Sequence, residues 1–149
     1  MQSLFLPADC DALRLRFAAL RPDSERRWGR MDPAQMLAHC AQGLEAAMTD
    51  RPVRQVFLGR LVAPFIRPLV LGAKPFRKNL PTSPRFLVAD ARNFDVELRR
   101  LAHLIDRYLQ RGPEAAAKVP HVFFGRLRGE QWGRLMFKHL DHHLRQFGV

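Results

Sequence analysis

Apolar side chains recur every three or four residues in four stretches of the chain, the spacing that lines one face of an α-helix. No stretch of useful length alternates cleanly between apolar and polar residues, so we expect no β-strand. Four amphipathic helices predict an all-α fold, a four-helix bundle with its core between the apolar faces. The predicted helices cover residues 9–20, 33–48, 92–110 and 131–146.

The second predicted helix has the clearest start in the chain. Asp32 can accept a hydrogen bond from the first helical N–H groups, and Pro33 suits the first helical position. Gln35 follows the cap by three residues, as in a capping box. The third predicted helix has the clearest end, because a Gly-Pro pair at 112–113 follows its last apolar residue.

Residues 50–84, between the second and third helices, are the least regular part of the chain. Apolar residues at 56, 57, 61 and 65 predict a short helix, which Pro64 and Pro68 are expected to end. In our preferred interpretation this segment packs its apolar residues onto the bundle. The alternative is a role at a membrane surface. We therefore predict a long proline-broken crossover between helices 2 and 3, punctuated by Gly72, Pro75, Asn79, Pro81 and Pro84.

Composition indicates one globular domain over residues 1–149, because 47% of the residues are hydrophobic and 26% are charged. The two cysteines, Cys10 and Cys40, are too few for a disulfide framework, which favours a reducing compartment. The N-terminal residues lack the pattern of a secretory signal, so we expect a cytoplasmic protein. The longest apolar tract, residues 58–73, contains two arginines and two prolines, which excludes an ordinary transmembrane span.

The formal net charge of +11 raises the question of a nucleic-acid partner. The basic residues are scattered, and only the short run from Lys74 to Lys78 resembles a patch. No recognition helix or platform of aromatic and basic residues is evident. Solvated basic faces are the better interpretation, and we expect no specific nucleic-acid partner.

The last predicted helix carries three of the six histidines of the chain. His139 and His143 are four residues apart, so they project from one face and can reach the same metal ion. About 100° of rotation per residue puts both at the edge of the apolar face, whereas His142 falls outside it. Gln146 follows one turn after His143, where it could orient a ligand imidazole or a bound water. The alternative is a helix with incidental histidines.

His39 on the second helix could complete a three-histidine site. It lies at the edge of the apolar face and, taken alone, it is better interpreted as a histidine at the rim of a core than as a ligand. Three imidazoles with open positions are typical of catalytic zinc, and imidazole also suits nickel, iron and copper. Cys40 is expected to be a small core residue, and we leave His103 and His121 out of the metal set.

Two segments resemble motifs of the DinB/YfiT-like metalloenzymes. Residues 31–39, MDPAQMLAH, resemble the first histidine motif, and residues 139–146, HLDHHLRQ, resemble the closing H-x-x-H-H-x-x-Q motif. The segments at 28–29, 74–76 and 123–125 look like an uncharacterised branch of that superfamily, a domain of unknown function. The resemblance implies a four-helix bundle with a divalent metal held by His39, His139 and His143. It also implies chemistry with low-molecular-weight thiols and a tendency to form homodimers.

The first functional hypothesis is therefore a metal-dependent enzyme, a thiol-dependent transferase or a hydrolase, acting on a small molecule. Zinc or nickel is the expected metal, with iron as an alternative, and catalytic residues beyond the ligands are not assigned. His142 and Gln146 are candidates for supporting contacts to the ligands. The second hypothesis is a non-catalytic helical binding or interaction protein in which metal is structural or absent. The third, a basic nucleic-acid binder, has the least support.

Overall fold

The computed structural model describes residues 1–80 and 83–149, so Pro81, expected at a turn of the crossover, lies outside the described residues. Within them the chain is entirely helical, with five α-helices, one 3-10 helix and no β-strand, which confirms the all-α prediction. The helices are α1 (Pro7–Ala19), α2 (Pro33–Ala47), α3 (Phe57–Leu71), η1 (Pro84–Phe86), α4 (Phe94–Ala117) and α5 (Gly129–Gln146).

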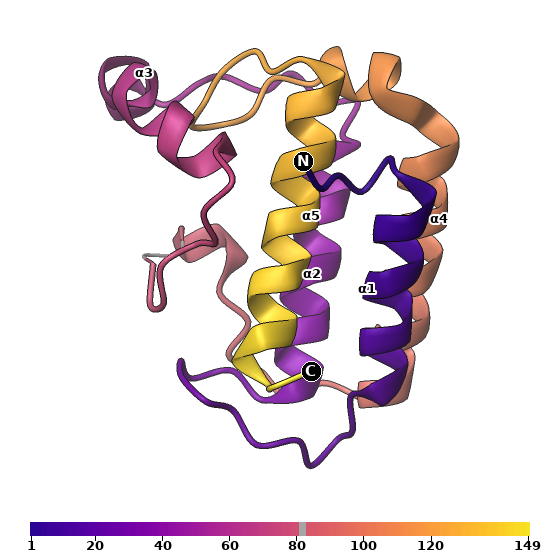
Figure 1. Ribbon diagram of the computed structural model, residues 1–149. Helices are drawn as coiled ribbons and strands as arrows, with labels where there is room; N and C mark the ends of the chain where they lie inside the picture. Colours follow the sequence, from indigo (N-terminus) through magenta and orange to yellow (C-terminus); the bar gives the residue numbers. More distant parts are fainter. Residues whose placement is uncertain (81–82) are drawn as a thin grey trace.

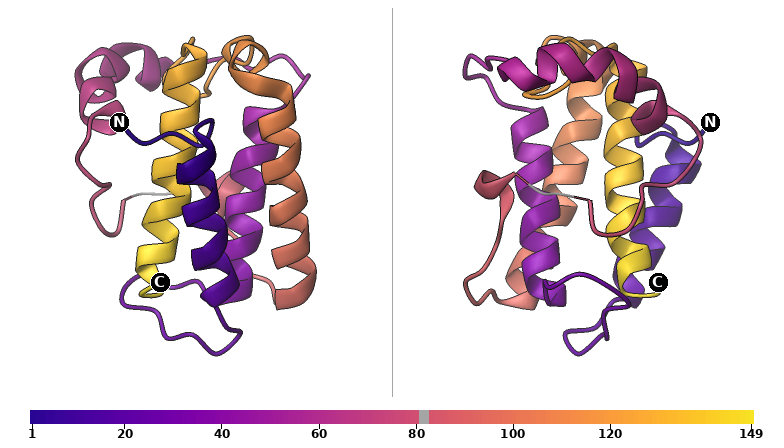
Figure 2. Two further views of the ribbon diagram at one scale, coloured as in Figure 1. Left: turned by 45° about the vertical axis from the view of Figure 1, so that its right-hand side comes forward. Right: turned by 90° about the vertical axis from the view of Figure 1, so that its left-hand side faces the viewer.

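Four of the helices, α1, α2, α4 and α5, run alongside one another, and α3 lies across one end of the group (Figure 1). The side views in Figure 2 show α3 projecting beyond the flank of α5, while the segment after it descends towards the opposite end. Helix α2 packs against both α4 and α5, and α1 packs against α5. This arrangement brings residues from the first and last thirds of the chain together between α2 and α5.

Helix α2 begins as its sequence predicts. The Asp32 carboxylate accepts from the Gln35 backbone N–H at 2.8 Å, and the Gln35 side chain accepts from the Asp32 N–H at 3.0 Å. Both hydrogen bonds satisfy N–H groups that have no partner within the helix. Cys40 is fully buried in the core face of α2 and burial raises the pKa of its thiol, which makes it a packing residue and not a nucleophile.

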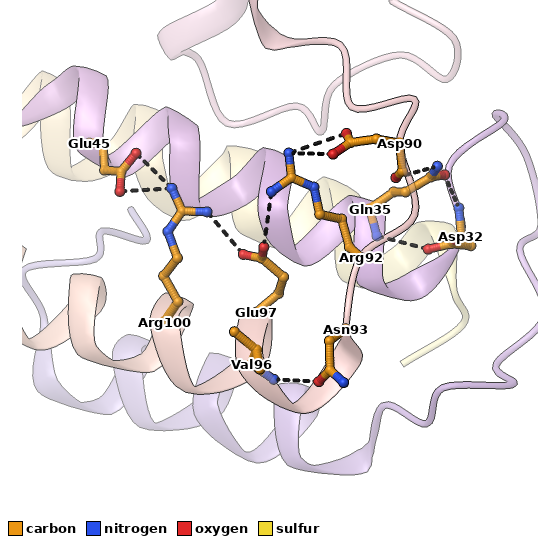
Figure 3. Close-up of polar contacts among 9 residues, drawn as sticks. All are labelled: Asp32, Gln35, Glu45, Asp90, Arg92, Asn93, Val96, Glu97 and Arg100. Atoms are coloured by element: carbon orange, nitrogen blue, oxygen red, sulfur yellow. Dashed lines mark hydrogen bonds and ion pairs between the residues drawn. The ribbon is translucent and has the colours of Figure 1, made fainter.

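A chain of ion pairs fastens the start of α4 to α2 (Figure 3). Arg100 donates to both carboxylate oxygens of Glu45 at 2.8 Å and to Glu97 at 2.9 Å. Glu97 is buried, and it also accepts from Arg92, which pairs with Asp90. Because the members lie on α2, on α4 and on the segment between η1 and α4, they hold that segment along α2.

Helix α3 is longer than predicted, and only one side of it packs on the bundle. It continues through both Pro64 and Pro68, although each proline removes a backbone hydrogen bond. One side of α3 packs on the bundle as our preferred interpretation required, because Ala63 and Leu71 are buried in the core and Ile66 and Val70 pack against it. The other apolar side chains of α3 do not. Five of them are between 57% and 80% exposed: Phe57, Leu58, Leu61, Phe65 and Leu69. No helix in the described part of the chain is long and apolar enough to cross a bilayer.

Cationic side chains of α5 hold the end of α3. The Lys138 ammonium donates to the carbonyls of Val70 and, at 2.8 Å, of Gly72, and Arg134 donates to Leu71 at 3.0 Å. These carbonyls lack helical partners, and positive charge is favourable at a helix C-terminus. On a helical wheel of α5, Lys138 falls opposite the core face, yet it is buried because it caps α3.

Asp141 also falls on the polar side of the helical wheel of α5, and it too is buried. Its carboxylate accepts from Arg16 of α1 at 2.7 Å and from Arg145 at 2.8 Å. The helical wheel of α5 alone could not show that α1 covers this position with a complementary charge.

In α4, Gly112 adopts φ 72° and interrupts the helix near its predicted end, but helical residues resume and continue to Ala117.

Candidate metal centre

Three histidine side chains converge between α2 and α5. His39 comes from α2, and His139 and His143 come from successive turns of α5. One ring nitrogen from each lies within 4.8 Å of the others. The ring centroids are 4.8–5.0 Å apart, and His39 and His143 are buried while His139 is partly exposed. The structure therefore brings together the three residues that the sequence nominated.

The tautomer of His39 follows from its outer hydrogen bond. Its Nδ1 lies 2.8 Å from the carbonyl oxygen of Phe86 in η1. A carbonyl oxygen only accepts, so Nδ1 carries the hydrogen and Nε2 carries the lone pair. That Nε2 faces the Nε2 atom of His139 at 3.0 Å. The lone pair of His39 is thus directed into the histidine cluster.

The tautomer of His143 also follows from its outer hydrogen bond, which is made to the side chain of Gln146. Gln146 donates its amide nitrogen to the Trp28 carbonyl at 2.9 Å, which assigns the orientation of the amide. Its oxygen then accepts from His143 Nδ1, 2.9 Å away, and leaves the lone pair on Nε2. Gly29 has φ 80°, and a Cβ there would collide with the Gln146 amide. A glycine after Trp28 lets the loop approach Gln146.

The His139 ring occupies space that Gly43 leaves open on α2. A Cβ at Gly43 would stand 2.9 Å from His139 Cε1, closer than real Cβ contacts come. Glycine in a helix interior costs roughly 0.5–1 kcal/mol relative to alanine, so its presence there has a packing reason. Gly43 is visible in the sequence one helical turn after His39. The reason for a glycine there is not visible, because the ring that needs the space comes from α5.

All three imidazoles are held in the neutral form at pH 7. Burial is the main cause, and it lowers the pKa of His143 to about 3, with the neighbouring His39 adding to the effect. Burial and the His143 charge place the pKa of His139 well below its ordinary value. Burial also lowers the pKa of His39. Neutral imidazole is the form that ligates metal ions.

The donor set fits a divalent transition metal. Zinc–imidazole bonds of about 2.0–2.1 Å put the nitrogens of a tetrahedral site roughly 3.3 Å apart. The observed distances bracket that spacing. The Nε2 atoms of His39 and His139 are 3.0 Å apart, and ligand nitrogens of all three histidines lie within 4.8 Å of one another. Hydrogen bonds from the outer ring nitrogens to Phe86 and Gln146 are the supports that ligand histidines usually have. The three histidines could hold a metal ion.

His142 does not join the cluster. It is partly buried, with its ring 5.7 Å from that of Trp28 and 5.9 Å from that of Phe76. Its contact with His143 is ring against ring, at 5.2 Å between centroids. As the helical wheel indicates, one histidine of the three on α5 points away from the other two.

A cavity of about 1040 Å³ adjoins the cluster, and both His39 and His139 line it. His121, which we had left out of the metal set, lines the same cavity. Its Nδ1 accepts from the backbone N–H groups of Phe123 and Phe124, each at 3.1 Å. Burial and the charge of Arg67 lower its pKa to about 4. It lies outside the three-histidine set as expected, but it is a cavity residue that no spacing could reveal.

Other titratable candidates lie elsewhere. His103, which we left out of the metal set, is exposed on α4. Glu45 is the only carboxylate among the described residues that line the cavity, and Arg100 holds both of its oxygens. The geometry therefore offers no free carboxylate as a general base beside the cluster within the described residues.

The family model described as "Protein of unknown function (DUF1569)" matches residues 3–148. No curated protein and no solved structure matches the chain.

Proposed function

The chain belongs to the DUF1569 family of proteins of unknown function, and we propose that it is a metal-dependent enzyme with His39, His139 and His143 as ligands. The observation that carries the proposal is the pair of outer hydrogen bonds. Phe86 and Gln146 hold protons on the Nδ1 atoms of two histidines and leave the lone pairs on their Nε2 atoms. Hydrogen bonds to the outer ring nitrogen are the support that metal-ligating histidines usually have, and this favours a metal site over a purely structural cluster.

We assign the family to the DinB/YfiT-like superfamily on the two histidine motifs and on the side-by-side packing of four helices. In this proposal α3 is an additional helix built into the crossover. Zinc or nickel is the preferred metal and iron the alternative, because all three suit imidazole ligands. A divalent ion held there would supply Lewis acidity and lower the pKa of a coordinated thiol or water.

The protein contributes a cavity beside the ligands, and this favours an enzyme over a closed structural site. His139 is the partly exposed ligand and, with His39, it lines the cavity, so a small molecule can reach the cluster. Trp132, Leu135 and Met136 form buried apolar walls of this cavity. We propose transfer to or from a low-molecular-weight thiol as the reaction class, with hydrolysis as the alternative.

Elemental analysis of protein purified without a histidine tag tests the site. We expect about one equivalent of metal, lost in the His39→Ala, His139→Ala and His143→Ala variants. The matched controls are His103→Ala and His142→Ala, which should keep it. Added zinc at 100 times its dissociation constant should stabilise the wild type by about 2.7 kcal/mol. Absence of stoichiometric metal together with an unchanged melting temperature under zinc or nickel would overturn the proposal.

The enzymatic part has its own assay. Metal-loaded protein is incubated with glutathione and an electrophilic aryl chloride, and chloride release is followed as the thioether forms. We expect turnover that the His139→Ala variant loses. Metal binding without turnover of thiol or ester substrates would support the proposed metal site and reject the proposed enzymatic activity.

The exposed face of α3 favours one further candidate, a non-catalytic interaction protein or a homodimer. Contiguous exposed apolar surface often marks an association site. Light scattering of the wild type and of a Phe57→Ser/Phe65→Ser variant tests this, since both side chains are at least 75% exposed. A dimer that the substitutions dissociate supports association through α3, and a monomeric wild type rejects the homodimer.

A further inference from the structure

The cavity beside the histidine cluster has walls of two kinds. Its inner wall on α5 is apolar and buried, formed by Trp132, Leu135 and Met136. Aromatic side chains from η1 and from the turn before α5 add to this wall, among them Phe86 and Phe123. A ligand that fills the inner part of the cavity must therefore present an apolar surface.

The outer part of the cavity is lined by Arg51, Arg54 and Arg85, whose side chains are all exposed. None of the three forms an ion pair with another described residue. Glu45, the one carboxylate among the described lining residues, is neutralised by Arg100. The opening of the cavity is therefore positively charged, with guanidinium groups available to a ligand.

The sign of this charge comes from the crossover as a whole. Residues 51–89 contain eight basic side chains and not one Asp or Glu. The wall that the crossover contributes therefore carries no compensating carboxylate of its own. The basic residues are Arg51, Arg54, Arg60, Arg67, Lys74, Arg77, Lys78 and Arg85.

We propose that this cavity binds an organic carboxylate with an apolar, ring-sized body. Its carboxylate contacts the arginines at the opening, and its body lies against Trp132 and Met136 near His139. Guanidinium groups match carboxylates with paired N–H donors, which gives orientation as well as attraction. A volume of about 1040 Å³ lies at the upper end for small-molecule sites, so the carboxylate and a second reactant fit together.

The claim that this ligand is the substrate rests on the proposed function. The claim that the cavity binds it does not. Titration calorimetry therefore starts with metal-free protein. The probes are 4-phenylbutyrate, its neutral amide 4-phenylbutyramide, and inorganic phosphate as an anion without a body. We expect the carboxylate to bind at least about tenfold more tightly than the amide, which corresponds to one charge-assisted hydrogen bond. Phosphate should bind more weakly than 4-phenylbutyrate.

The variant Arg54→Gln/Arg85→Gln should reduce the affinity for the carboxylate to that for the amide. Both side chains are exposed and form no ion pair with another described residue, so the fold should be retained. The control Arg99→Gln/Arg107→Gln removes the same charge from exposed positions of α4 that do not line the cavity. It should bind like the wild type.

Equal affinity for carboxylate and amide, or equal losses in the two double variants, would overturn the inference. Carboxylate binding that appears only after metal loading would overturn it as well, because the metal and not the arginines would then be the anion site. If the protein distinguishes the carboxylate from the amide but does not take up metal, the result would support the anion site and reject the proposed enzyme.

Discussion

The Nε2 atoms of His39 and His139 face each other at 3.0 Å, and only one of them can carry a hydrogen. His39 keeps its hydrogen on Nδ1 for the Phe86 carbonyl. In metal-free protein the bridging hydrogen must therefore belong to His139 Nε2. The cluster is held together by a proton at the place where a metal ion would be bound.

Metal binding should therefore change the tautomer of one histidine and not the others. We expect His139 to move its proton from Nε2 to Nδ1, while His39 and His143 stay protonated on Nδ1 throughout. Nitrogen-15 NMR of the imidazole rings, recorded before and after one equivalent of zinc, measures this. A change of tautomer at His39 or His143 would contradict the assignment from their outer hydrogen bonds.

Gly43→Ala should displace the His139 ring and weaken metal binding, because the new methyl group meets Cε1 at 2.9 Å. In a His139→Ala background the same substitution loses its clash and gains helix propensity. It should then stabilise the protein by roughly 0.5–1 kcal/mol. Thermal unfolding of the four proteins of this cycle, without metal, measures the coupling. Stabilisation of equal size in both backgrounds would show that the ring does not need the space.

Gln146→Leu should lower metal affinity about 10- to 100-fold without unfolding the protein, since His143 loses the acceptor that orients it. Gln146→Glu keeps an acceptor oxygen and should recover most of the affinity. The control is Gln110→Leu, an exposed glutamine on α4. Competition titration with a chromophoric chelator gives the affinities, and equal values for the Leu and Glu variants would reject the orienting role.

Acid should destabilise the metal-free protein from about pH 6.5 downward. His121 has a pKa of about 4 in the folded state and an ordinary value of 6.5, so the unfolded chain takes up the proton first. Its contribution to stability is complete above pH 6.5 and is lost as the pH falls to about 4. The loss is on the order of 1–3 kcal/mol.

His121→Asn keeps an acceptor for the two backbone N–H groups but cannot be protonated in this range. We expect a flatter dependence of the melting temperature on pH between 6.5 and 4 than in the wild type. His103→Asn, at an exposed position, is the control. Parallel curves for the wild type and His121→Asn would show that burial of His121 has no such effect.

Lys138→Met should loosen α3 while leaving the rest of the fold in place, because the ammonium donates to carbonyls at the end of that helix. Hydrogen–deuterium exchange should become faster in residues 57–71 and remain unchanged in α2. Lys118→Met, at an exposed lysine, is the control. Faster exchange throughout the molecule would instead indicate that Lys138 supports the whole bundle.

Local signals predicted much of this molecule. The Asp32–Gln35 capping box located the start of α2, and the spacing of His139 and His143 put both rings on one face of α5. These features depend on a single helix, whose periodicity is visible in the sequence. The pairing of His39 with them needed only the assumption that α2 and α5 are neighbours.

What could not be predicted depends on partners from other elements. Lys138 and Asp141 look like surface residues on α5, and they are buried because α3 and α1 supply complementary groups. The Phe86 carbonyl that orients His39 is a backbone group and has no signature in the sequence. Prolines were expected to end α3, but tertiary contacts override that preference.

The two tryptophans of the chain have different neighbours near the histidine cluster. Trp28 is joined to it through Gln146, whereas Trp132 lines the cavity. Each indole is thus an intrinsic fluorophore for a different event. Quenching of Trp28 by a paramagnetic ion would record metal loading, and a change in Trp132 emission would record occupancy of the cavity. Single Trp→Phe variants would allow the order of metal binding and ligand binding to be followed by fluorescence.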